Sequence, residues 1–139
     1  MSNTALQERL RDFFRQHGVA FNGSKIAAVY LFGSQARNTA KHVSDIDIGL
    51  LLEQDPPPGL DGLCQRLASE LETFLKREVD LVVLNTACAD LVHRVLKDGI
   101  FVLDTNPSFR IRFEVKKRNE YFDLLPILRE YRRQKRDAT

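Results

Sequence analysis

Two aspartates, Asp45 and Asp47, stand one residue apart at the start of an apolar run in this chain of 139 residues. Residues i and i+2 of a β-strand face the same side, so the two carboxylates would project together. Like charges repel and lose hydration on burial, so the pair needs a compensating positive charge, most simply a metal ion. Hard cations such as Mg²⁺ take carboxylate and phosphate oxygens as ligands. The spacing therefore predicts a metal site at the head of this strand.

A Gly-Ser pair, Gly33 and Ser34, precedes the two acids and directly follows an apolar run. A glycine lets the backbone approach a ligand closely, and backbone N–H groups with a serine hydroxyl can hold phosphate oxygens. Arg37, three residues after Ser34, could pair with a phosphate. The pattern predicts a nucleotide beside the metal. The structural alternative is a capped turn followed by a strand with two solvated acids.

A third acid, Asp80, interrupts an otherwise apolar run over residues 79–85. It shares a strand face with apolar residues, where a bare carboxylate would be unfavourable. If this strand neighbours the one that carries Asp45 and Asp47, the three carboxylates would converge, an arrangement that suits metal-assisted phosphoryl chemistry. A salt-bridged acid at a strand edge is the alternative for Asp80.

Hydrophobic periodicity predicts the elements that would position these residues. The predicted helices cover residues 4–17, 60–75 and 87–97. The predicted strands cover residues 26–32, 46–52 and 79–85, and residues 101–104 could add a short edge strand. Three prolines make residues 55–62 a loop. Strands that alternate with helices predict an α/β (α+β) fold class, in which helices flank a small mixed sheet.

The last third of the chain is open to two interpretations. Residues 109–115 alternate like a strand, yet Asn106 and Pro107 form a good helix start. We expect a long helix that Pro126 kinks or breaks. Residues 110–137 carry ten Lys/Arg and five Asp/Glu, a local net charge of +5. This basic end could face an acidic protein, RNA or only water.

The bulk composition is that of a globular protein, with 43% hydrophobic and 29% charged residues. The longest apolar run is far too short to span a bilayer, and the N-terminal segment is charged and amphipathic rather than secretory. We therefore expect a cytoplasmic protein without a membrane partner. Cys64 and Cys88 lack metal-ligand spacing, and we expect them to be reduced packing residues.

The stretch GSQARNTAKHVSDIDIGLLL, residues 33–52, resembles the signature of the nucleotidyltransferase superfamily related to DNA polymerase β. That signature is Gly-Ser, a ten-residue gap and Asp-x-Asp, and Asp80 matches the family's third acid. The short chain and the GSxAR start most resemble the minimal nucleotidyltransferases, which include MntA-type antitoxins encoded beside HEPN-domain toxins. The order of elements extends the resemblance to about residues 20–105.

The resemblance implies a nucleotidyltransferase fold and a reaction in which ATP and Mg²⁺ deliver AMP to a tyrosine hydroxyl of a cognate HEPN toxin, thereby neutralising it. By the matching positions, the nucleotide would be bound by Gly33, Ser34, Arg37 and Ser44. The metal would be held by three acids, Asp45, Asp47 and Asp80, of which Asp80 could also take the acceptor's proton.

We expect residues 1–105 to form the nucleotidyltransferase core, with the N-terminal helix included. Residues 106–139 would be a C-terminal helical extension that packs on the core and binds the toxin in a hetero-oligomer, within a single domain overall. Three alternatives remain: an antitoxin that acts mainly by direct binding, a small-molecule nucleotidyltransferase of the antibiotic-modifying kind, and an RNA-binding module. We do not expect direct binding of nucleic acid, because few aromatic residues lie in the basic segment.

Overall fold

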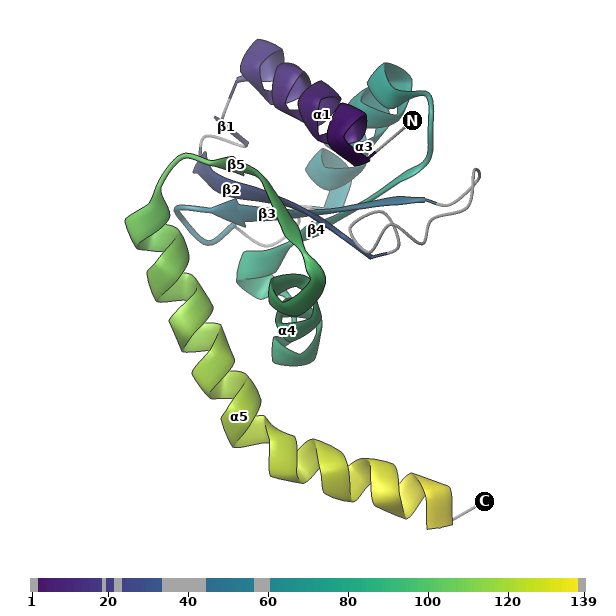
Figure 1. Ribbon diagram of the computed structural model, residues 1–139, viewed down its shortest axis with the longest axis vertical. Coiled ribbons are helices and arrows are strands. Elements are labelled where there is room, and N and C mark those ends of the chain that lie inside the picture. The colour runs from purple at the N-terminus through teal and green to yellow at the C-terminus, as the bar shows by residue number, and fades with distance from the viewer. Residues whose placement is uncertain (1–2, 19, 22–23, 34–44, 57–60, 138–139) are drawn as a thin grey trace.

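The computed structural model describes residues 3–18, 20–21, 24–33, 45–56 and 61–137. In this part of the chain, helices flank one mixed sheet, which confirms the predicted fold class (Figure 1). The strands are β1 (Ala20–Phe21), β2 (Ser24–Phe32), β3 (Ile46–Leu52), β4 (Val79–Val83) and β5 (Ile100–Asp104). The helices are α1 (Asn3–His17), α3 (Asp61–Leu75), α4 (Ala89–Asp98) and α5 (Pro107–Asp137), with a short 3₁₀ helix, η1 (Leu84–Thr86).

Strand β2 lies in the middle of the sheet. It pairs antiparallel with β3 along one side, and with β5 and the short β1 along the other. Strand β4 pairs with β3 in parallel. In the described part of the chain, β4 is therefore one edge of the sheet, and β1 and β5 lie at the other edge. The parallel pair β3–β4 sets the geometry of the candidate site.

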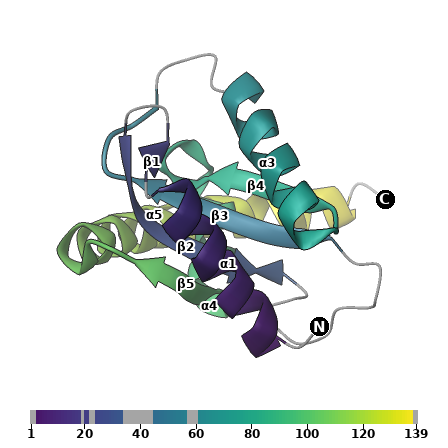
Figure 2. The same cartoon turned by 90° about the horizontal axis from the view of Figure 1, so that it is seen from above.

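The helices cover the two faces of the sheet in two layers (Figures 1 and 2). Helices α1 and α3 pack on one face, and α4 and the first half of α5 pack on the other. The first core gathers buried apolar side chains of α1, α3 and the sheet, among them Leu10, Phe14, Leu71, Ile46 and Ile48. The second core gathers buried side chains of β2, β3 and α4, among them Tyr30, Leu51, Val92 and Val95.

The predicted ends of helices and strands agree with the structure where residues next to each end determine it. Helix α1 ends at His17 as predicted, because Gly18 takes a positive φ of 96° and its N–H donates to the Phe14 carbonyl at 2.9 Å. β3 has the predicted bounds. None of the described helices combines the length and apolar character that crossing a membrane requires.

The predicted strand 79–85 is wrong in its last two residues, because β4 ends at Val83 and η1 follows. The amide of Asn85 accepts a hydrogen bond from the Leu52 N–H at 2.9 Å and donates one to the Leu52 carbonyl at 2.8 Å. A side chain thus replaces the backbone pairing that a longer strand would have made. The next helix begins at Ala89 rather than Ala87, whose N–H closes the 3₁₀ turn on the Leu84 carbonyl.

Residues 109–115 are helical, so the strand interpretation of their alternation is wrong. Asn106 caps α5 by accepting a hydrogen bond from the Phe109 N–H at 3.2 Å, and Pro107 is the first helical residue. Pro126 lies inside the helix, which bends in its middle as predicted (Figure 1). We call residues 107–122 the proximal half of α5 and residues 123–137 the distal half.

A polar network fastens the proximal half of α5 to the sheet. The Tyr30 hydroxyl donates to Glu114 Oε1 at 2.9 Å, and Arg110 donates to the same oxygen at 3.0 Å and to Asp104 Oδ2 at 2.9 Å. Burial, together with the charge and hydrogen bond of Glu114, raises the pKa of Tyr30 far above its ordinary value. Tyr30 therefore stays a neutral hydrogen-bond donor at physiological pH.

Candidate active site

Asp47 and Asp80 lie side by side on the neighbouring parallel strands β3 and β4, where they are direct register partners. Their side chains consequently project from the same face of the sheet. The apolar neighbours Ile46 and Ile48 are fully buried in the first core, and this burial turns Asp47 to the opposite face. Asp47 remains half-buried and Asp80 is exposed. Strands β3 and β4 are thus neighbours in the sheet, as the predicted approach of Asp80 to Asp47 requires.

Asp45 lies just before β3 and interacts with Glu78, the residue just before β4. The Ile46 N–H donates to the Glu78 carbonyl at 2.9 Å, which holds the two strand starts together. A side-chain hydrogen bond with Asp45 and repulsion from that carboxylate raise the pKa of Glu78. Two carboxyl groups can share a hydrogen bond only when one holds a proton, so negative charge is in excess here.

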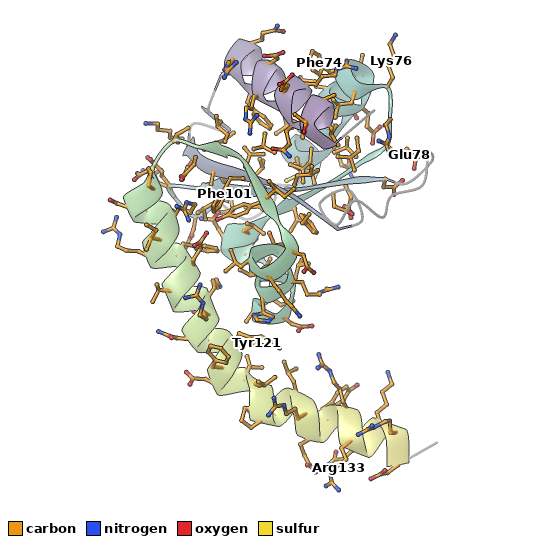
Figure 3. All side chains as sticks on the ribbon, in the orientation of Figure 1. Phe74, Lys76, Glu78, Phe101, Tyr121 and Arg133 are labelled. Atoms are coloured by element: carbon orange, nitrogen blue, oxygen red, sulfur yellow. The ribbon has the colours of Figure 1, made fainter. Side chains whose placement is uncertain are left out.

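Glu78 is a site residue that sequence reasoning missed. It stands two residues before Asp80, the same spacing that separates Asp45 from Asp47. The ladder places these two i, i+2 acidic pairs next to each other. The spacing was readable in the sequence, but only the strand pairing shows that the two pairs meet. Figure 3 labels Glu78 at this end of the sheet.

Gly33 directly follows the last residue of β2 and lies against Asp47. Its φ of 69° is in the left-handed region. A Cβ added at Gly33 would overlap Asp47 Oδ2 and lie 3.0 Å from Asp47 Cγ. Only glycine meets both requirements, the backbone angle and the close approach. The predicted glycine thus borders the predicted metal-binding carboxylate.

A groove of about 410 Å³ lies between α3 and β4, with Asp80 in its wall. Helix α3 contributes polar side chains, and β4 contributes its outer edge. The lining residues include Gln65, Ser69 and Glu72 of α3 and Leu81 of β4. The Val79 N–H on this edge donates to Glu72 Oε1 at 3.2 Å. Val79 and Leu81 turn their side chains toward α3, so the Asp80 carboxylate projects from the opposite face with Asp47, and Asp80 borders this groove only at the strand edge.

Three of the predicted nucleotide-binding residues, Ser34, Arg37 and Ser44, lie outside the described residues. Within the described ranges, no three carboxylate, imidazole or thiol groups converge as a ready metal site. The structure brings Asp47 next to Asp80 and Asp45 next to Glu78, in two adjoining pairs. Carboxylate oxygens and an excess of negative charge fit a hard divalent cation, as the sequence predicted.

Comparison with known proteins places this geometry in a family. The family model described as "Polymerase beta, Nucleotidyltransferase" matches residues 9–108. A protein of Methanocaldococcus jannaschii, described as a candidate protein adenylyltransferase, is 36% identical over 103 residues, which are 74% of this chain and 100% of that protein. The protein adenylyltransferase MntA of Shewanella oneidensis is 37% identical over 79 residues, which are 56% of this chain and 54% of MntA.

Solved structures show the same fold. A toxin–antitoxin complex with AMP-PNP contains a chain that matches with a TM-score of 0.70 and 25% identity, over 90% of this chain and 97% of that chain. A mutant toxin–antitoxin complex that includes MntA matches with a TM-score of 0.65 and 27% identity, over 94% and 98% of the two chains. An MNT antitoxin in complex with a tri-AMPylated HEPN toxin of Shewanella oneidensis matches at 22% identity and a TM-score of 0.66, over 93% and 98%, which supports the fold alone.

The family model covers residues 9–108, which are most of the chain. The chain therefore belongs to the polymerase β-type nucleotidyltransferases and is a nucleotidyltransferase enzyme.

Proposed function

We propose that this protein is a Mg²⁺-dependent protein adenylyltransferase that transfers AMP from ATP to a tyrosine hydroxyl of a cognate HEPN-family toxin and thereby acts as its antitoxin. The observation that carries the proposal is the pairing of Asp47 with Asp80 beside Gly33. Two relatives described as protein adenylyltransferases, at 36% and 37% identity, support protein as the acceptor class. The likeness to a chain of a toxin–antitoxin complex that holds AMP-PNP supports ATP and a toxin partner.

The proposed reaction assigns each site residue a task. Asp45, Asp47 and Asp80 would hold Mg²⁺, which would neutralise phosphate charge and polarise the α-phosphate. The triphosphate would lie against the backbone at Gly33, with Ser34, Arg37 and Ser44 as further contacts. The tyrosine oxygen then forms a bond to the α-phosphorus, the bond from that phosphorus to the bridging oxygen breaks, and pyrophosphate leaves. A carboxylate oxygen of Asp80 accepts the tyrosine proton.

The face of β3 and β4 from which Asp47 and Asp80 project is the proposed approach for the acceptor. A tyrosine placed there would lie beside the Asp80 carboxylate, the group that takes its proton. A partner protein, rather than this chain alone, would then bring the acceptor into position.

Direct binding of the toxin is a second candidate function. Several large apolar residues of α5 are exposed, including Phe122 at 55% and Ile127 at 67%. Such a surface would let the protein cover a toxin as well as modify it. In this alternative, a catalytically inactive variant would still neutralise the toxin at stoichiometric concentration.

The test is to incubate the protein with ATP, Mg²⁺ and the product of the adjacent gene, and to locate added AMP by peptide mass spectrometry. The expected result is AMP on a tyrosine of the partner, absent with Asp47→Asn. Asp12→Asn, an acidic change at an exposed position of α1, which packs on the face of the sheet opposite to Asp47 and Asp80, is the matched control and should label normally. Labelling of small molecules only, or neutralisation that Asp47→Asn retains in full, would refute the proposed transfer.

A further inference from the structure

The distal half of α5 carries an apolar strip that faces solvent. Leu124, Ile127 and Tyr131 are 39%, 67% and 62% exposed. Their spacings of three and four residues place them on one side of the helix. We call these three residues the distal strip. Apolar residues that cluster on one exposed helix face differ from the single apolar residues that any surface carries.

The distal strip continues the face by which the proximal half packs. Phe109 and Phe113 pack against the second core, and Tyr121 stacks on His93 of α4 with ring centroids 3.7 Å apart. The helical period carries this face onward to Leu124, Ile127 and Tyr131. In Figure 1 the helix has by then bent away past α4. The same amphipathic face is thus packed in its first half and exposed in its second.

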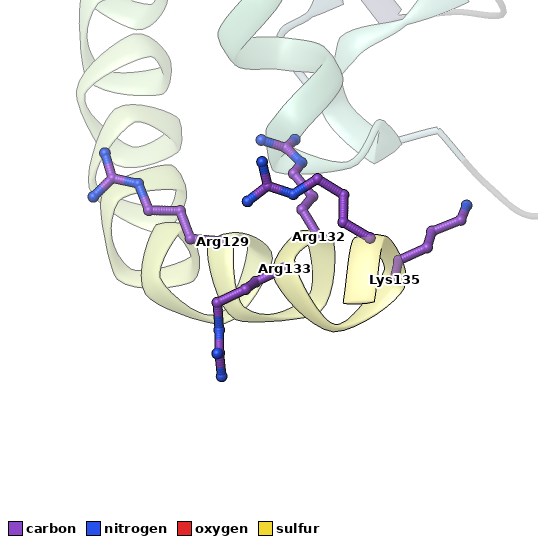
Figure 4. A pocket seen from close by; sticks show the side chains of 5 residues that line it. Arg129, Arg132, Arg133 and Lys135 are labelled. Carbon is purple, nitrogen blue, oxygen red and sulfur yellow. The ribbon is translucent and has the colours of Figure 1, made fainter. Parts of the chain in front are cut away.

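Basic side chains border the distal strip. A hollow of about 840 Å³ is lined by Arg129, Arg132, Arg133, Lys135 and Arg136 (Figure 4), which we call the basic cluster. Residues 129–137 contain five basic and two acidic residues, a net charge of +3. Arg132 already attracts a carboxylate, Asp90 of α4, at 3.6 Å. Arg133 likewise pairs with Glu130 at 2.6 Å, and the side chains of both pairs remain substantially exposed. The segment keeps a net positive charge that is accessible to another partner.

We propose that the distal strip and the basic cluster together form the docking surface for the protein acceptor, and that the matching surface of the acceptor is an apolar ridge bordered by Asp and Glu. This inference rests on the proposed function, because it concerns the partner of that same site. Buried apolar side chains with arginine are typical of the cores of interfaces, and complementary charge steers association. A second copy of this chain would bring two basic clusters together. A nucleic acid would leave the distal strip exposed.

The position of the distal half agrees with this role. In Figures 1 and 2 it lies on the same side of the molecule as the ends of β3 and β4 that carry the acids. A partner seated on the distal half would therefore extend along the side on which the acceptor tyrosine must reach Asp80. The distal half alone lacks a core to hold it helical, since α5 has no fully buried residue. Partner binding would supply the missing packing surface.

The chain offers a matched pair of variants to test the distal strip. The test variant is Ile127→Ser with Tyr131→Ser. The control is Ile111→Ser with Val115→Ser, which are also exposed, at 50% and 46%, but lie on the opposite side of α5. In titration calorimetry with the adjacent gene's product, the test variant should bind at least about tenfold more weakly, and the control within about twofold of wild type. ATP binding should be unchanged in both variants.

The basic cluster is tested separately with Arg132→Ser and Arg136→Ser together, against the exposed pair Lys116→Ser and Arg118→Ser. The cluster variant should associate with the partner more slowly than wild type, and its association rate should depend much less on the salt concentration. Equal partner affinity in the distal-strip variant and its control would overturn the inference. So would micromolar binding of a single-stranded RNA 20-mer that depends on the cluster while partner binding does not.

The same experiments separate this inference from the proposed function. If wild-type protein binds the partner through the distal strip but transfers no AMP, the proposed function fails and the docking surface stands. If wild-type protein labels the partner and the distal-strip variant labels it equally fast at limiting partner concentration, the docking surface fails and the proposed function stands.

Discussion

The contact between Gly33 and Asp47 is the most constrained feature of the site. The glycine needs its left-handed angle, and the carboxylate occupies the space where any other residue would carry a Cβ. Gly18 shares the positive φ, at 96°, but a Cβ there would meet no atom within 4 Å. Substitutions at the two glycines therefore distinguish the effect of backbone strain, which both cause, from displacement of the Asp47 carboxylate, which only a substitution at Gly33 causes.

We predict that Gly33→Ala abolishes nucleotidyl transfer, whereas Gly18→Ala leaves it intact. Both should lower the free energy of unfolding by about 1–2 kcal/mol, because both force alanine into the left-handed region. Only Gly33→Ala must also push Asp47 out of place. Urea unfolding and AMP transfer to the partner measure the two effects. Normal transfer by a folded Gly33→Ala variant would show that the position of Asp47 is not critical.

The crowded acids Asp45 and Glu78 give a prediction about pH. Because the folded pKa of Glu78 is raised above its ordinary value of 4.5, the folded protein binds more protons than the unfolded chain just above that pH. The associated stability is present below the ordinary pKa and is lost as the pH rises through the raised one. Without divalent cations, Glu78→Gln should therefore raise the melting temperature at pH 7 and change it little at pH 4. A wild-type melting temperature with the same pH dependence as that of Glu78→Gln would contradict the prediction.

Among the elements, α5 has two halves with different tasks. Its proximal half is bound to β2 and β5 through Tyr30, Arg110, Glu114 and Asp104. Its distal half leaves the body after the bend near Pro126 (Figure 1). The proximal half therefore contributes to stability, and the distal half is available for binding.

The hydrogen bond from Tyr30 to Glu114 is expected to contribute to stability. Tyr30→Phe should lower the free energy of unfolding by about 1 kcal/mol, because it removes a buried hydrogen bond without changing the shape of the ring. Tyr131→Phe, at an exposed position of α5, is the control and should have no measurable effect. Equal stability of Tyr30→Phe and wild type in urea titrations would show that the network does not hold α5.

The bend in α5 is expected to serve orientation rather than stability. A proline inside a helix costs about 3 kcal/mol relative to alanine, so Pro126→Ala should increase helicity in circular dichroism without loss of stability. It should nevertheless weaken partner binding, because straightening redirects the distal strip. Pro107→Ala, at the tolerated first position, is the control. Unchanged partner affinity after Pro126→Ala would mean that the direction of the distal half is unimportant.

Sequence alone predicts those features that local patterns determine. The bounds of β3 follow from its apolar run, and the end of α1 and the start of α5 follow from Gly18 and Asn106. The role of Glu78 could not be predicted, because it depends on which strand pairs with β3 and in which register. The end of β4 at Val83 could not be predicted for a similar reason, because the Asn85 side chain hydrogen-bonds to the backbone of Leu52, in a strand distant in the sequence. The exposed distal strip likewise depends on where α4 ends.

Across the whole molecule, the acids of the candidate site and the basic cluster lie well apart. Figure 3 shows Glu78 at one end of the sheet and Arg133 far away on the distal half of α5. Asp47 and Asp80 belong to the sheet, and the proposed docking surface belongs to a helix that extends beyond it. We therefore expect substitutions in the two regions to affect AMP transfer and partner binding independently.

The position of an isotope label in ATP distinguishes transfer of AMP to the partner from transfer of phosphate. The protein is incubated with Mg²⁺, the product of the adjacent gene and ATP labelled at either the α- or the γ-phosphate. We expect that the α-label alone becomes attached to a partner tyrosine, that pyrophosphate is released in equal amount, and that Asp45→Asn or Asp47→Asn abolishes both. Attachment of the γ-label, or attachment of the α-label that survives both substitutions, would contradict it.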